Sequence, residues 1–180
     1  LPTILSAFIG VTADAWYPMG NETWTPDFLQ NYGGNLVWMV EGAVELVDMG
    51  TCGEAITWTL DVENTLTISG SGAMTNYNSP AMVPWHAYRE TITKVVLEDS
   101  ITGLTDYAFR EMVNLTDITL PGGLTEISME AFYGCFGLTA IVIPNGVVTI
   151  GDRAFYGCNK LASVTFGEGL QNVGANAFYN

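Results

Sequence analysis

The feature that most constrains the fold is the dipeptide Ala-Phe, which returns at a fixed interval. From residue 108 onwards it occurs four times, and these phenylalanines are 23 residues apart each time. Further apolar positions recur six, nine and eleven residues after each of the first three phenylalanines. These positions are Leu115, Leu138 and Leu161, then Ile118, Ile141 and Val164, and then Leu120, Ile143 and Phe166. Self-similarity at a fixed period of this length is the signature of a repeat architecture.

Each unit predicts a strand, a turn and a second limb. Residues 138–143 alternate apolar with small or polar side chains, which is typical of a half-buried strand. Residues 144–146, Pro-Asn-Gly, predict a turn. Residues 151–158 lack β-branched side chains, and we expect one or two helical turns there. Because 23 residues cannot bury their own apolar face, successive units are expected to stack and to place their strands in a parallel sheet.

The two ends of the array depart from the pattern. Ile92, Val95 and Leu97 occupy the same offsets counted from position 86, so that His86 stands in the phenylalanine slot of a degenerate first unit. Terminal repeats are expected to be atypical, and we expect Trp85 and His86 to cover this end of the core. The array stops within a repeat, which would leave the last core face exposed, and we expect the natural chain to continue.

The order of residues within the unit resembles the BspA-type leucine-rich repeat. Ala-Phe, Gly-Cys, Leu-Thr and Ile-Pro follow one another, and residues 154–161 are the nearest to the family pattern. Single coils depart from it at Ser128, at Glu111-Met112 and at Gly167, where the family has glycine, Gly-Cys and proline. The resemblance implies an α/β fold, a right-handed leucine-rich-repeat solenoid with a parallel β-sheet and short helices.

Residues 50–84 resemble the amino-terminal cap that opens such arrays. Within them, apolar residues alternate on both sides of an Asp-Val-Glu-Asn turn, which independently predicts a β-hairpin. These residues are Ile56, Trp58 and Leu60 before the turn and Leu66 and Ile68 after it. We therefore expect a β-hairpin cap over residues 50–84 and about four repeats over residues 85–180, the last one incomplete.

Residues 1–49 lie outside the resemblance. Residues 1–15 form an apolar run that closes on Ala-Asp-Ala and resembles the end of a secretory signal, the alternative being an apolar strand or helix of the mature protein. Residues 16–49 are rich in aromatics, which favours a small core over sugar stacking. Residues 21–23 match a glycosylation sequon, and residues 36–40 predict a buried strand.

Charge and cysteine content exclude several classes of function. A formal charge of −14 disfavours contact with nucleic acid. The three cysteines and one histidine do not show metal-ligand spacing, and we predict no metal and no cofactor. Cys135 and Cys158 follow their phenylalanines by three residues, in the slot that Met112 occupies one repeat earlier. That slot suits a small apolar group, although a disulfide between adjacent repeats is the alternative.

The candidate binding residues are the strand positions expected to face solvent. They are Lys94, Val96, Asp117, Thr119, Ala140, Val142, Ser163 and Thr165. The family resemblance implies a secreted or surface-exposed protein, commonly from bacteria that live on a host, whose repeats mediate adhesion or other protein contacts without catalytic residues. We therefore expect a non-enzymatic module that binds a protein or glycan on a host or neighbouring cell. The alternatives are a structural spacer, or a carbohydrate-binding accessory segment of a larger surface protein or enzyme.

Overall fold

The chain divides into two units, residues 1–45 and residues 46–180. The computed structural model describes the backbone of residues 12–18 and 35–41 and the whole of residues 44–180. In the first unit, β1 (Thr12–Pro18) runs parallel to β2 (Asn35–Glu41), and β2 contains the strand expected at residues 36–40. Residues 1–11 of the expected signal segment, the sequon and the aromatic side chains of residues 16–43 lie outside the described residues.

The second unit opens with three antiparallel strands, β3 (Leu46–Gly53), β4 (Ile56–Asp61) and β5 (Thr65–Gly70). The expected hairpin is present, with Trp58 opposite Ile68. Its turn is held by the Asp61 carboxylate, which accepts hydrogen bonds from the backbone N–H groups of Glu63 (3.0 Å) and Thr65 (2.8 Å). Strand β3, which the sequence did not predict, adds a third strand at the edge.

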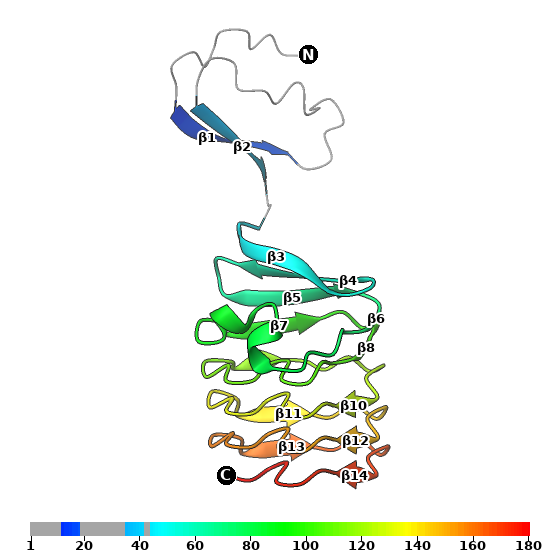
Figure 1. Cartoon of the computed structure of the whole chain (residues 1–180). Coiled ribbons are helices and arrows are strands. Elements are labelled where there is room, and N and C mark those ends of the chain that lie inside the picture. Colours follow the sequence, from blue (N-terminus) through cyan, green and yellow to red (C-terminus); the bar gives the residue numbers. More distant parts are fainter. Residues whose placement is uncertain (1–11, 19–34, 42–43) are drawn as a thin grey trace. The chain divides into compact units, whose positions relative to one another are not determined.

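One set of repeat strands continues from the hairpin. It consists of β7 (Lys94–Leu97), β9 (Asp117–Ile118), β11 (Ala140–Val142) and β13 (Ser163–Thr165). β7 pairs in parallel with β5 and with β9, and β11 pairs in parallel with β13. The paired residues of neighbouring repeats, such as Lys94 with Asp117 and Ile141 with Val164, are 23 positions apart. The expected register and parallel pairing are therefore confirmed, and the strands follow one another in layers (Figure 1).

A second set of short strands was not expected. β10 (Glu126–Ile127), β12 (Thr149–Ile150) and β14 (Asn172–Val173) form a parallel three-stranded sheet. β8 (Ile101–Gly103) pairs in parallel with β6 (Gly72–Ala73). Each of β10, β12 and β14 has only two residues, which is too few for a period-two pattern to be recognised in the sequence.

The expectation of short helices in the repeats is wrong. In the described part of the chain, the only helices are two 3₁₀ turns that precede β7, η1 (Pro80–Met82) and η2 (His86–Tyr88). Residues 151–158 form turns. Two local features prevent a helix: Arg153 has φ of 53°, and the N–H of Phe155 donates to the carbonyl of Ala177 in the next repeat at 2.7 Å. The same pairing recurs from Phe132 to Ala154 at 2.8 Å.

The core is a stack of aromatic rings along the repeats. Phe132 lies 5.2 Å from Phe109 and 5.0 Å from Phe155, measured between ring centroids, and both Phe132 and Phe155 are fully buried. Trp85 stacks on Phe109 with 6.4 Å between the ring centroids, so Trp85 fills the first ring position. The prediction that His86 occupies this position is therefore wrong. Trp85 also meets Trp58 of β4 edge-on at 5.8 Å. The hairpin thus covers the first ring of the stack.

Candidate functional site

All eight predicted contact residues are exposed, and we call them the strand face. Lys94 and Val96 belong to β7, Asp117 to β9, Ala140 and Val142 to β11, and Ser163 and Thr165 to β13, while Thr119 follows β9. They alternate with the inward-facing Val95 and Ile141, which are 2% and 4% exposed. The strand pleat therefore puts these eight side chains on the outer surface of the strands.

The end of the strand face nearest the hairpin is charged. Nζ of Lys94 lies 3.1 Å from a carboxylate oxygen of Asp117, its partner across the parallel ladder. Both side chains are about half exposed, so solvent screens the pair and its net contribution to stability is small. With Val96 and Thr119 they line a shallow depression of about 220 Å³. This region offers one positive and one negative group to a partner.

The centre of the strand face is apolar and contains an interruption of the sheet. β9 ends the five-stranded sheet, and β11 begins a separate one with β13, so the parallel ladder does not continue from β9 to β11. A groove of about 310 Å³ lies at this interruption. Its lining comprises Ile118, Thr119, Leu120, Ala140, Ile141, Val142 and Pro144. Val142, which is 64% exposed, lies at the rim of the groove. An apolar side chain of a partner could therefore enter the groove and pack against the exposed methyl groups of Val142.

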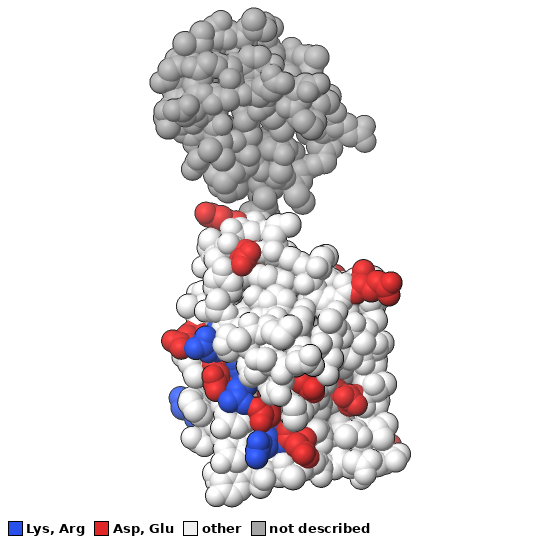
Figure 2. Space-filling model, viewed as in Figure 1, with Lys and Arg blue, Asp and Glu red and all other residues white. Residues whose placement is uncertain are grey.

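A second feature lies on the turns that precede each strand, residues 105–115, 128–138 and 151–161, which we call the turn limb. All three arginines of the protein take part in one connected series of ion pairs. The series begins at Arg89 and continues along the turn limb. Figure 2 shows these blue and red side chains alternating in a band across the stack. Its order is Arg89, Glu111, Arg110, Glu130 and Arg153.

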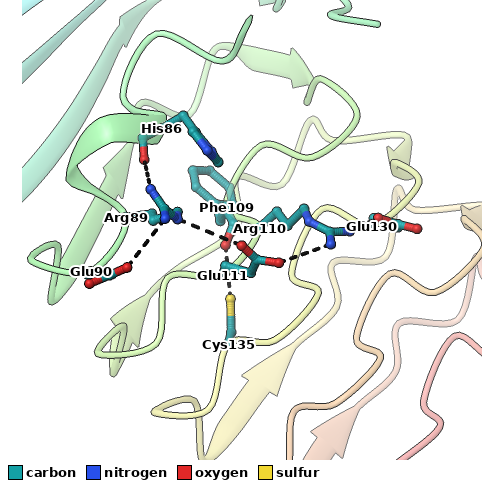
Figure 3. Close-up of polar contacts among 8 residues, drawn as sticks. All are labelled: His86, Arg89, Glu90, Phe109, Arg110, Glu111, Glu130 and Cys135. Atoms are coloured by element: carbon teal, nitrogen blue, oxygen red, sulfur yellow. Dashed lines mark hydrogen bonds and ion pairs between the residues drawn. The ribbon is translucent and has the colours of Figure 1, made fainter. Parts of the chain in front are cut away.

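Glu130 is the most buried member of this band. Its side chain is 11% exposed and accepts hydrogen bonds from Arg110 and from Arg153, the latter at 3.4 Å. Arg110 also contacts Glu111 at 3.0 Å, and its guanidinium group lies 4.0 Å from the ring centroid of Tyr133. Figure 3 shows the ion pairs that Glu111 forms with Arg89 and Arg110. A buried carboxylate held by two guanidinium groups is well compensated.

A row of tyrosines runs beside the arginines. Tyr133 and Tyr156 stack at 5.1 Å, and Tyr156 and Tyr179 at 5.2 Å. With Arg110, Glu130, Arg153 and Asn176 they line a hollow of about 420 Å³, which we call the Arg–Tyr hollow. Sequence reasoning missed it, although a signal was present, because a tyrosine follows the phenylalanine in each of the last three Ala-Phe units.

The cysteines are built into the core and are free. The thiol of Cys135 donates to the carbonyl of Phe109, and that of Cys158 to the carbonyl of Phe132, both at 3.1 Å. Burial raises the pKa of Cys158 to about 11 and the pKa of Cys135 well above its usual value. The structure therefore favours the expected role as small apolar groups over the disulfide, and neither thiol is activated as a nucleophile.

The single histidine has surroundings that favour its neutral form. Partial burial lowers the pKa of His86, and nearby Arg89 and Arg110 lower it further against the opposing effect of Glu111. Among the described residues, no group of His, Cys, Asp and Glu side chains is arranged to hold a metal ion. The described residues also include no helix with the length and apolar character needed to span a membrane.

Several solved structures are similar to this chain, and the first of those below supports the fold. A leucine-rich repeat protein from T. pallidum has a TM-score of 0.51 and 23% identity, over 72% of this chain and 66% of that one. A leucine-rich repeat protein from Bacteroides ovatus has a TM-score of 0.46 and 20% identity, over 69% and 37%. A leucine-rich cell surface protein from Faecalibacterium prausnitzii has a TM-score of 0.43 and 21% identity, over 73% and 52%.

The chain thus spans less than two thirds of the length of these neighbours. Among curated protein sequences, none is significantly similar to it. Residues 86–180 match the family described as BspA type leucine rich repeat region, which is more than half of the chain. The 23-residue register, the aromatic stack and this match agree, and the chain belongs to the BspA-type leucine-rich repeat family.

Proposed function

We propose that the chain is a non-catalytic interaction module of a secreted or surface-exposed bacterial protein, and that it binds a partner protein on a host or neighbouring cell through the strand face. Leucine-rich repeats are in general scaffolds for protein contacts, which supports the class of function. The neighbour from F. prausnitzii is described as a cell surface protein, which supports the location.

The observation that carries the proposal is the groove between β9 and β11. This site combines an interrupted ladder, an apolar groove and the exposed side chain of Val142. An apolar anchor surrounded by small and polar groups is typical of the centre of a protein interface. The neighbouring pair of Lys94 and Asp117 adds charged groups at the edge, where they favour correct orientation more than affinity.

A binding assay with two matched variants tests the proposal. The full chain is immobilised and titrated with purified extracellular-matrix proteins, alongside Val142→Glu on the strand face and Val148→Glu, an exposed valine that lies outside it. We expect saturable binding by the unchanged chain and by Val148→Glu. We expect loss of binding by Val142→Glu, because a carboxylate would be desolvated in an apolar groove.

Three outcomes would contradict the proposal. Equal loss in both variants would attribute binding to net charge, and equal binding in both would place the contact elsewhere on the molecule. Absence of binding to every matrix protein would favour the structural spacer. Circular dichroism of each variant controls for the fold.

A further inference from the structure

The Arg–Tyr hollow has a charge opposite to that of the whole chain. Two arginines and one glutamate line it, whereas the chain carries a formal charge of −14. Two of the five basic residues of the chain are therefore gathered on the wall of one hollow. Basic side chains gathered in one place of an acidic protein favour an anionic ligand there.

The two arginines are not equivalent. Arg110 is 20% exposed and is engaged by Glu111, by Glu130 and by the ring of Tyr133. Arg153 is 56% exposed, and its one ion pair is the 3.4 Å contact with Glu130. A guanidinium group has five N–H donors in a planar fork, so most of those of Arg153 remain available to a ligand. Glu130, which is nearly buried, orients this guanidinium group without covering it.

The backbone makes the position of Arg153 specific. Its φ of 53° places it in the left-handed region, as do the φ values of 52° at Glu130 and 55° at Asn176, the corresponding residues of the adjacent repeats. The three side chains thus occupy the same repeat position and line the same hollow. The same conformation occurs at Tyr107 one repeat earlier, with φ of 62°, so it is a regular feature of the repeat turn.

The remaining lining indicates the chemistry of the ligand. Tyr133, Tyr156 and Tyr179 contribute hydroxyl groups that can both donate and accept hydrogen bonds, and Asn176 adds an amide. A sugar presents several hydroxyl groups, which match this polar lining of hydroxyl and amide groups.

We propose that the Arg–Tyr hollow binds a carboxylate-bearing sugar, with the carboxylate on Arg153 and the sugar hydroxyl groups on the tyrosine row and Asn176. The site lies on the turn limb and its ligand is a glycan, so the inference is independent of the proposed protein contact at the strand face. A carboxylate matches the guanidinium fork in a bidentate geometry. One free arginine also suits a monoanion better than a highly charged group.

The test uses the full chain and two pairs of probes that differ in charge. Galacturonic acid is compared with its methyl ester, and sialyllactose with lactose, by calorimetry or by chemical-shift titration. The two pairs distinguish uronic from sialic acids. Either acid should bind saturably, and its neutral counterpart should bind about tenfold more weakly or not at all, since each factor of ten in Kd corresponds to about 1.4 kcal/mol.

Matched variants assign the binding to Arg153. Arg153→Met should raise the Kd about tenfold, and Arg153→Lys should give an intermediate value because it keeps the charge without the fork. Lys160→Met removes an exposed charge outside the hollow and should change the Kd less than about twofold. Arg153 is more than half exposed, so its replacement leaves the core intact.

Four results would overturn the inference. They are the absence of saturable binding by both acids, equal binding of acid and neutral probe, equal effects of Arg153→Met and Lys160→Met, and equal or tighter binding of triglutamate. The last result would mean that the hollow recognises any carboxylate and has no preference for sugars.

Discussion

The strand limb and the turn limb of the repeats differ in regularity. In the turn limb, three backbone hydrogen bonds of 2.6–3.0 Å join each pair of neighbouring repeats from residue 107 onwards, and the same three positions donate each time. In the strand limb, formed by β7, β9, β11 and β13, the ladder is interrupted between β9 and β11. The same repeats are therefore joined continuously on one side and discontinuously on the other.

This difference concerns how strongly the contacts between repeats constrain each limb. The turn limb inserts the phenylalanines into the core and fixes the spacing of the repeats, and its Ala-Phe pair and its final leucine recur in each unit. The exposed strand positions differ between units and carry charged, small and apolar residues in turn. Surface that is free to vary on a rigid scaffold is where binding sites are usually built.

The largest effect should follow from the loss of one stacked ring. Phe132→Ala removes a fully buried side chain between Phe109 and Phe155 and should lower the free energy of unfolding by about 3–5 kcal/mol, as large core deletions do. Urea unfolding followed by circular dichroism measures the change. Phe136→Ala, at a position 45% exposed, is the control and should cost much less. Equal costs would contradict the central place of the stack.

A smaller loss of stability is expected when Glu130, the most buried member of the ion-pair band, is replaced. Glu130→Gln leaves Arg110 and Arg153 without their shared carboxylate and should destabilise the chain by about 1–3 kcal/mol, the usual effect of losing a hydrogen bond between charged groups. The loss should shrink in high salt only slightly, because the carboxylate is nearly buried. If unfolding is unaffected by this substitution, the band contributes nothing to the turn limb.

The left-handed positions of the turn limb allow a reciprocal exchange. Glu111 has φ of 59° in the slot that holds Gly134 in the next repeat, where φ is 69°. Glu111→Gly relieves this backbone strain and should therefore raise the free energy of unfolding by about 1 kcal/mol. The loss of the exposed ion pairs of Glu111 should reduce this gain by a small amount. Gly134→Ala should destabilise it by a similar amount, since an added Cβ would have ordinary contacts at 3.5 Å and only the backbone is strained. Changes of the same sign in both variants would refute this account.

The smallest effect is expected on the strand face. Val142→Thr changes a side chain that is 64% exposed and should alter the free energy of unfolding by less than about 0.5 kcal/mol. A similar value is expected for Ser163→Thr, which is also exposed. A loss of several kcal/mol at Val142 would show that the groove is part of the core and would remove the reason to place a partner there.

The sequence was informative where side chains repeat and uninformative where backbone geometry decides. The 23-residue register, the hairpin around Trp58 and the outward direction of Val142 all follow from apolar periodicity. The absence of β-branched residues at 151–158 suits a helix and a turn equally, and the left-handed backbone of Arg153 carries no sequence signal of the kind that glycine gives.

The Arg–Tyr hollow was hidden for a different reason. Arg110 and Glu130 are 20 residues apart and do not occupy equivalent repeat positions, so that no fixed interval joins them. Their contact depends on how far each turn extends toward the next, which the periodic pattern does not specify. Strand β3 was missed because Leu46 and Val47 are both exposed, and its apolar residues do not alternate cleanly.

Amide hydrogen exchange of the full chain tests the contrast between the two limbs most directly. The account predicts slow exchange at the N–H groups of Phe109, Phe132 and Phe155, which donate across the turn limb, and faster exchange in residues 117–120 and 140–142, where the ladder is interrupted. Equal protection of both segments, or slower exchange in the strand limb, would contradict it.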